Sequence, residues 1–78
     1  MDPNYTYFLI IQLKNDDASV MKVFSSDTYK WTFERNTLDE LSYILINELN
    51  GNSTECYPLS SLLYFKETRT KKGEKHDH

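Results

Sequence analysis

The nine residues YTYFLIIQL, Tyr5–Leu13, constrain the fold of this 78-residue chain more than any other stretch. A β-strand sends successive side chains to opposite faces, and here both faces are apolar. One face carries Phe8 and Ile10, and the other carries the odd-numbered residues Tyr5, Tyr7, Leu9, Ile11 and Leu13. We therefore predict a strand over residues 5–14 that has apolar groups to cover on both sides.

Two further strands are predicted downstream of this one. Turn-forming residues at 15–18 precede a mostly apolar stretch over 19–24, which we interpret as the return strand of a hairpin. A second turn over 25–27 leads into TYKWTFE, where aromatic and polar residues alternate strictly. This period of two predicts a third strand over 28–34.

A helix is predicted over residues 38–49. Thr37 and Glu40 have the spacing of a capping box, in which each side chain satisfies the other residue's backbone amide. Asn50 and Gly51 supply a left-handed stop at the other end. Between these signals, large aliphatic residues gather on one face at helical spacing: Leu38, Leu41, Ile44, Leu45, Ile46 and Leu49.

The segment after the predicted helix has two interpretations. Residues 52–55 are predicted to form a loop. Pro58 could then open a short helix, since Leu59, Leu62 and Leu63 have helical spacing. We favour a turn near 58–61 followed by a strand over 62–68, because the bulky Leu63–Tyr64–Phe65 run suits a strand.

Taken together, these segments predict an α+β fold. A small, mostly antiparallel sheet of three or four strands would carry one α-helix packed on one face, in the order β-β-(β)-α-β. We expect one domain over 1–69. Residues 70–78 contain no apolar side chain and are expected to form a disordered basic tail.

Charge and composition limit the functions, the cellular location and the source that we expect for this chain. Residues 1–65 carry nine acidic and four basic side chains, a net of −5, while residues 66–78 carry three and five, a net of +2. An acidic domain is a poor starting point for duplex binding.

With no secretion signal, no membrane-spanning run and a single cysteine, we expect a cytoplasmic protein. Residues with AT-rich codons are plentiful, which suggests a low-GC genome, a phage or a mobile element.

The sequence holds few groups that suit catalysis. His76 and His78 are the only histidines, and both lie in the predicted tail, where a general base would not be held in place. Cys56 has no neighbouring group that would activate its thiol. Asp16 and Asp17 lack the spacing of a calcium loop. We predict a chain that is not an enzyme and has no cofactor and no metal.

The apolar groups that one helix cannot cover predict an interaction surface. Three coverings stay open: the chain's own C-terminal segment, a second copy of the chain, or a different protein. We predict a protein-interaction module, a regulator or inhibitor that occludes a site on its partner. The candidate partner-binding residues are aromatic or aliphatic: Phe8, Ile10, Tyr29, Trp31 and Tyr64.

A nucleic-acid-binding accessory protein is the alternative. Aromatic side chains on a sheet can stack bases, and a basic tail can contact phosphates. The tail residues that would do so are Arg69, Lys71, Lys72 and Lys75.

Overall fold

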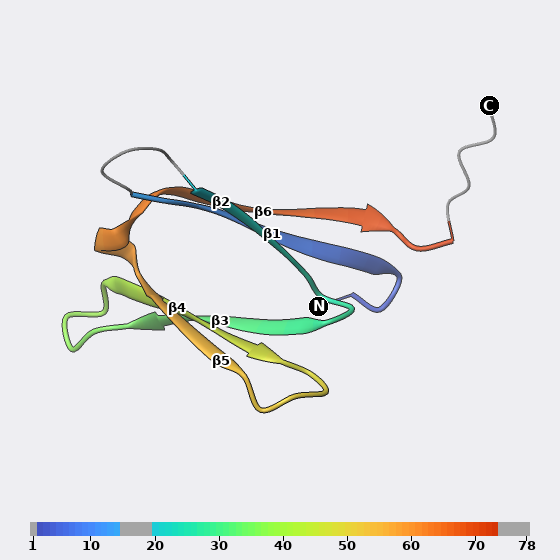
Figure 1. Cartoon of the computed structure of the whole chain (residues 1–78), viewed down its shortest axis with the longest axis horizontal. Helices are drawn as coiled ribbons and strands as arrows, with labels where there is room; N and C mark the ends of the chain where they lie inside the picture. The colour runs from blue at the N-terminus through green and yellow to red at the C-terminus, as the bar shows by residue number, and fades with distance from the viewer. Residues whose placement is uncertain (1, 15–19, 74–78) are drawn as a thin grey trace.

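The computed structural model describes residues 2–14 and 20–73, which form six β-strands and one 3-10 turn. Two three-stranded sheets, in the orders β2-β1-β6 and β3-β4-β5, make two layers, and every pair of neighbouring strands is antiparallel (Figure 1). The elements are β1 Tyr5–Leu13, β2 Val20–Ser25, β3 Tyr29–Arg35, β4 Leu41–Glu48, β5 Thr54–Pro58, η1 Leu59–Ser61 and β6 Leu62–Lys71.

The predicted α+β fold is wrong, because the part of the chain that the structure describes contains no α-helix. The chain crosses between the layers twice. A short turn over 26–28 links β2 to β3, and η1 links β5 to β6 (Figure 1). The second sheet takes the place that the predicted helix was to fill, so the architecture is sheet on sheet.

The segment predicted as a helix is β4, the central strand of its sheet. Its residues alternate: Ile44 and Ile46 are fully buried, whereas Leu38 and Leu49, which belonged to the predicted helical face, are 76% and 50% exposed. The predicted cap is a turn instead. Asn36 accepts hydrogen bonds from the amides of Leu38 and Glu40, and Asp39 has a φ of 61°. A left-handed residue at this point prevents a right-handed helix from starting.

Most of the predicted strands are confirmed. The first, second and third match β1, β2 and β3 within one or two residues, and the predicted turn near 58–61 is η1, followed by β6. The predicted loop over 52–55 is wrong at its end, because Thr54 and Glu55 already belong to β5. The turn predicted at 15–18 lies outside the described residues. Thr70 and Lys71, assigned to the tail, continue β6 beside Thr6 and Tyr5.

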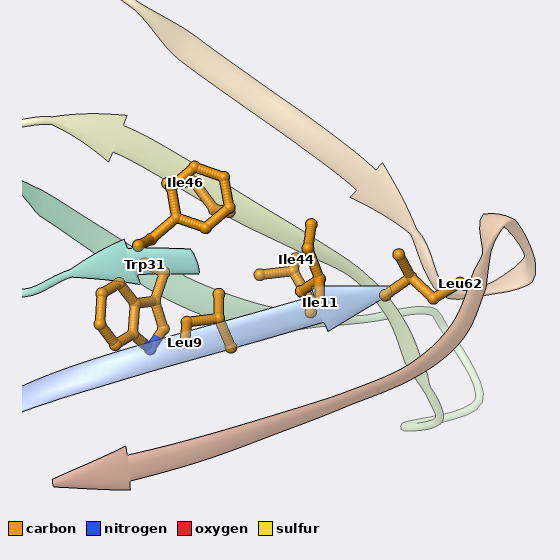
Figure 2. Packing of buried hydrophobic residues seen from close by; sticks show 7 residues of the cluster. Leu9, Ile11, Trp31, Ile44, Ile46 and Leu62 are labelled. Atoms are coloured by element: carbon orange, nitrogen blue, oxygen red, sulfur yellow. The ribbon is translucent and has the colours of Figure 1, made fainter. Parts of the chain in front are cut away.

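The core lies between the two layers (Figure 2). The odd-numbered face of β1 points into it, with Leu9 and Ile11 fully buried against Ile44 and Ile46 of β4. The other buried members are Phe24, Trp31 and Leu62. The side chains that pack around this cluster are Tyr7, Leu13, Tyr29, Tyr57, Leu59 and Phe65. The two isoleucines of β4 are β-branched, which suits a strand with neighbours on both sides.

Side chains join the two layers along both lateral sides. Between β3 and β6, the indole N–H of Trp31 donates to the Glu67 carboxylate at 2.8 Å, and the Phe33 and Phe65 rings lie 5.8 Å apart. Between β2 and β5, the Lys22 ammonium donates to the Tyr57 hydroxyl at 3.0 Å. These contacts fix the order in which strands of one layer lie over strands of the other.

Candidate functional site

The face of the β2-β1-β6 sheet that points away from the core is the strongest candidate site, and we call it the outer face. Residues directly opposite on neighbouring strands share a face, so the strand register defines its rows. The first row is Met21, Gln12 and Tyr64. The second row is Val23, Ile10 and Lys66, and the third is Ser25, Phe8 and Thr68.

The apolar side chains of the outer face are concentrated on β1 and β2. Met21 and Val23 are 57% and 58% exposed, and Ile10 and Phe8 beside them are half-buried. Along β6 the same face becomes polar at Lys66 and Thr68, leaving Tyr64 at one corner. Among the described residues, no element lies over this face. An open sheet normally keeps such a face polar.

The other sheet follows the normal pattern and serves as an internal comparison. Its outward rows contain polar groups such as Lys30 and Asn47, or small residues such as Thr32 and Cys56 on either side of Leu45. The central Leu45 is half-buried, and its neighbours on the two edge strands are exposed. The apolar character of the outer face is therefore specific to one sheet.

The structure separates the five predicted partner-binding residues into two groups. Phe8, Ile10 and Tyr64 lie together on the outer face. Trp31 is buried in the core, and Tyr29 packs its ring edge-on against Phe24, with centroids 5.1 Å apart.

Sequence reasoning left Met21 and Val23 out of the candidate site. Their signal was present in the sequence, because β2 carries apolar residues at both parities, as β1 does. The missing information was the register between β1 and β2, which places Val23 directly opposite Ile10.

The predicted nucleic-acid-binding residues lie at the far end of β6. The Arg69 guanidinium lies over the Tyr5 ring, 4.2 Å from its centroid, and Lys71 is opposite Tyr5 in the register. The Lys72 ammonium is 4.0 Å from the Asp27 carboxylate. Lys75 lies outside the described residues, as do His76 and His78.

A polar cluster lies between the two sheets, where β2 contacts β5. The Tyr57 hydroxyl donates to the Glu55 carboxylate, and the Lys22 ammonium lies 3.6 Å from that carboxylate. The pKa of Lys22 is raised, chiefly by its hydrogen bond with Tyr57. Burial raises the pKa of Tyr57, and the hydrogen bond to Glu55 raises it further. This cluster holds the inward face of β2 against the second sheet, so it has a structural role.

Within residues 2–14 and 20–73 there is no cavity and no cluster of three metal-ligating side chains. Cys56 is exposed on the outward side of β5. No helix in this part of the chain has the length and apolar character to cross a membrane.

Comparisons with protein-family models, with characterised proteins and with solved structures find no match for this chain. The class to which it belongs is therefore described by its geometry: a small two-sheet β-protein with one apolar outward face.

Proposed function

We propose that this chain is a small non-enzymatic protein-interaction module that docks a partner protein on its outer face. The observation that supports this most directly is the row in which exposed Val23 lies opposite half-buried Ile10 on an uncovered sheet. A contiguous exposed apolar patch on a small protein marks a partner site. In this role the module acts as a regulator or inhibitor that occludes a site on its partner.

The chemistry of the outer face suits a protein partner. Its β2 side is apolar and includes Met21, a flexible side chain that adapts to irregular surfaces. Tyr64 at the corner offers a ring for burial and a hydroxyl for a rim hydrogen bond. Lys66 and Thr68 supply a polar rim along β6.

Capture from the native host with matched variants tests this function. Ile10→Asp and Tyr64→Asp place a charge in the docking face, whereas Thr32→Asp places the same charge at an exposed position on the opposite side of the protein. We expect one set of captured proteins to be retained by the wild type and by Thr32→Asp. The same set should bind at least about tenfold more weakly to the two outer-face variants. Equal capture by all four proteins would contradict the proposal.

A second candidate function is binding of single-stranded nucleic acid at the far end of β6. It is supported by the stacking of Arg69 on Tyr5, with Lys71 alongside, since aromatic rings and arginine planes both stack on bases. A salt titration against fluorescent single-stranded and duplex oligonucleotides tests it. Affinity that falls steeply with salt would favour this function. An absence of binding at about 50 mM salt would rule it out.

A further inference from the structure

The two sheets of this protein have four outer strand edges, and the one along β2 has an unusual composition. The Ser26 amide donates to the Tyr7 carbonyl, and the Tyr7 amide donates back to the Ser26 hydroxyl. The backbone groups of Tyr7 in β1 and of Ser26, just after β2, therefore point toward one another. In an antiparallel pair, hydrogen-bonding direction alternates residue by residue. The backbone groups of Lys22 and Phe24 therefore face β1, and those of Met21 and Val23 face away from the sheet.

The outward backbone groups of β2 have no strand partner among the described residues. Every backbone hydrogen bond of β2 within 2–14 and 20–73 belongs to its pairing with β1 or to the turn after Ser25. Such an edge is a template for another strand, and proteins usually protect it with charged side chains or proline.

The other three edges carry this protection. On β6 the residues from Lys66 to Lys71 include four charged side chains, namely Lys66, Glu67, Arg69 and Lys71. β3 carries Lys30, Glu34 and Arg35, and β5 is only five residues long and ends at Pro58.

β2 lacks this protection on its exposed side. Its single charged residue, Lys22, points inward and is held by Tyr57 and Glu55. The side chains that flank the outward edge are Met21 and Val23, both apolar and more than half exposed. An apolar, unpaired edge of this kind is suited to binding an extended strand with the same character.

We propose that two copies of this chain pair through their β2 strands, antiparallel about a twofold axis at Val23, to form one continuous six-stranded sheet. The order across the dimer would be β6-β1-β2 followed by β2-β1-β6 of the second copy. This inference concerns the strand edge rather than the outer face, so it goes beyond the proposed function and does not depend on it.

An axis at Val23 is preferred to one at Lys22 or at Met21, the two preceding residues of β2. An axis at Lys22 would place Lys22 opposite its own copy, and like charges directly opposite one another are destabilising. An axis at Met21 would place Val23 opposite residue 19, which precedes β2, so fewer residues of the two β2 strands would pair. With the axis at Val23, Met21 lies opposite Ser25 and Lys22 opposite Phe24, so no like charges meet.

This register also explains why apolar groups are concentrated on one side of the outer face. Across the axis, Val23 and its copy become adjacent side chains on the same face. Ile10 follows on the far side of each Val23. The apolar halves of the two outer faces merge at the axis, and the polar β6 strands lie at the two outer margins.

Sedimentation velocity of the full chain with charged variants at position 23 tests the proposal. The wild type should reach about twice the 9.3 kDa mass of one chain at high micromolar concentration. Val23→Lys and Val23→Glu should each dissociate, with dimer affinity at least about tenfold weaker, because like charges meet at the axis. An equimolar mixture of the two variants should recover the dimer, because opposite charges then lie opposite one another.

Two controls separate this result from loss of folding and from other registers. Val23→Thr keeps a β-branched side chain and should remain a dimer. Met21→Lys mixed with Met21→Glu should dimerise no more tightly than either variant alone, because Met21 lies opposite Ser25 and not its own copy. Circular dichroism should show every variant folded, since both positions are exposed in one chain.

Three results would overturn the inference. A wild type that sediments as one chain at high micromolar concentration would show that the β2 edge is covered from within the chain or awaits a different partner. A Val23→Lys variant that stays dimeric would place the interface elsewhere. Rescue by the Met21 pair, without rescue by the Val23 pair, would reject the proposed register. None of these results would affect capture of another protein through Ile10 and Tyr64, so the two proposals fail separately.

Discussion

Trp31 Nε1 lies 2.8 Å from Glu67 Oε1, and this hydrogen bond joins the two sheets between β3 and β6. Trp31 is 5% exposed, whereas Glu67 is an exposed residue of β6. A buried indole N–H needs a partner, and here an edge strand of the opposite sheet supplies it. The contact links the largest side chain of the core to the β2-β1-β6 sheet.

Loss of the Glu67 carboxylate should therefore destabilise the protein. We expect Glu67→Ala to lower the free energy of unfolding by about 1–2 kcal/mol, because the indole N–H loses its acceptor. Lys66→Ala, on the outer face of the same strand, should stay within about 0.5 kcal/mol of the wild type. Urea unfolding followed by Trp31 fluorescence measures both. Equal effects of the two substitutions would mean that the hydrogen bond contributes nothing.

The assignment of residues 41–48 to a strand gives a second prediction. Ile44 is fully buried, so Ile44→Val should cost about 0.5–1.5 kcal/mol of unfolding free energy. Leu38 is 76% exposed in the turn, so Leu38→Ala should change it by less than about 0.5 kcal/mol. A helix over 38–49 would bury Leu38 and give the substitution a far larger effect. Equilibrium denaturation of the two variants distinguishes these structures.

The left-handed backbone at Asp39 gives a third prediction. A φ of 61° costs an L-residue roughly 1–2 kcal/mol, and β-branched side chains suffer most. Asp39→Val should therefore lower the melting temperature, while Asp39→Gly should leave it near that of the wild type. If Val and Gly at this position gave the same melting temperature, the turn would have a different backbone.

The cluster where β2 meets β5 makes stability sensitive to alkaline pH. The pKa values of Lys22 and Tyr57 are both raised, so the folded chain holds these protons more tightly than the unfolded chain. A raised pKa adds stability below the unfolded value, and this stability is lost as pH rises through the folded value. Unfolded lysine and tyrosine titrate at about pH 10, so the unfolding free energy should fall as the pH rises above this value.

Tyr57→Phe tests the source of this pH dependence. Removing the hydroxyl removes one titrating group and the hydrogen-bond partner of Lys22, so the decline in stability above about pH 10 should become shallower. Urea midpoints measured at about pH 8 and about pH 11 provide the comparison. An unchanged slope in Tyr57→Phe would assign the dependence to other groups.

The strands could be predicted where the local sequence favoured them, as in the aromatic and aliphatic run of β1 and the strict alternation of β3. The error at β4 has a physical origin. Leu41 and Leu45 are four residues apart, which fits a helix, yet Ile44 and Ile46 are two apart and β-branched, which fits a strand. The local pattern supports both structures. Pairing with β3 and β5, together with the left-handed Asp39, selects the strand, and neither is visible in the local sequence.

The candidate site was predictable in part for the same reason. Parity alone identified Phe8 and Ile10 as the side of β1 away from the odd-numbered residues. Parity could not show which side of β3 faces the core, so Trp31 was grouped with them although it packs between the sheets. Val23 required the strand register, which depends on contacts between segments distant in sequence.

The most direct test of this account compares two adjacent isoleucines of β1. Ile11 is fully buried in the core, and Ile10 lies on the outer face, so the same change to aspartate probes the two sides of one strand. We expect Ile11→Asp to fail to fold. We expect Ile10→Asp to keep the wild-type circular dichroism spectrum and to lose no more than about 1 kcal/mol of unfolding free energy. If Ile10→Asp also fails to fold, the outer face belongs to a second core and the proposed docking surface is wrong.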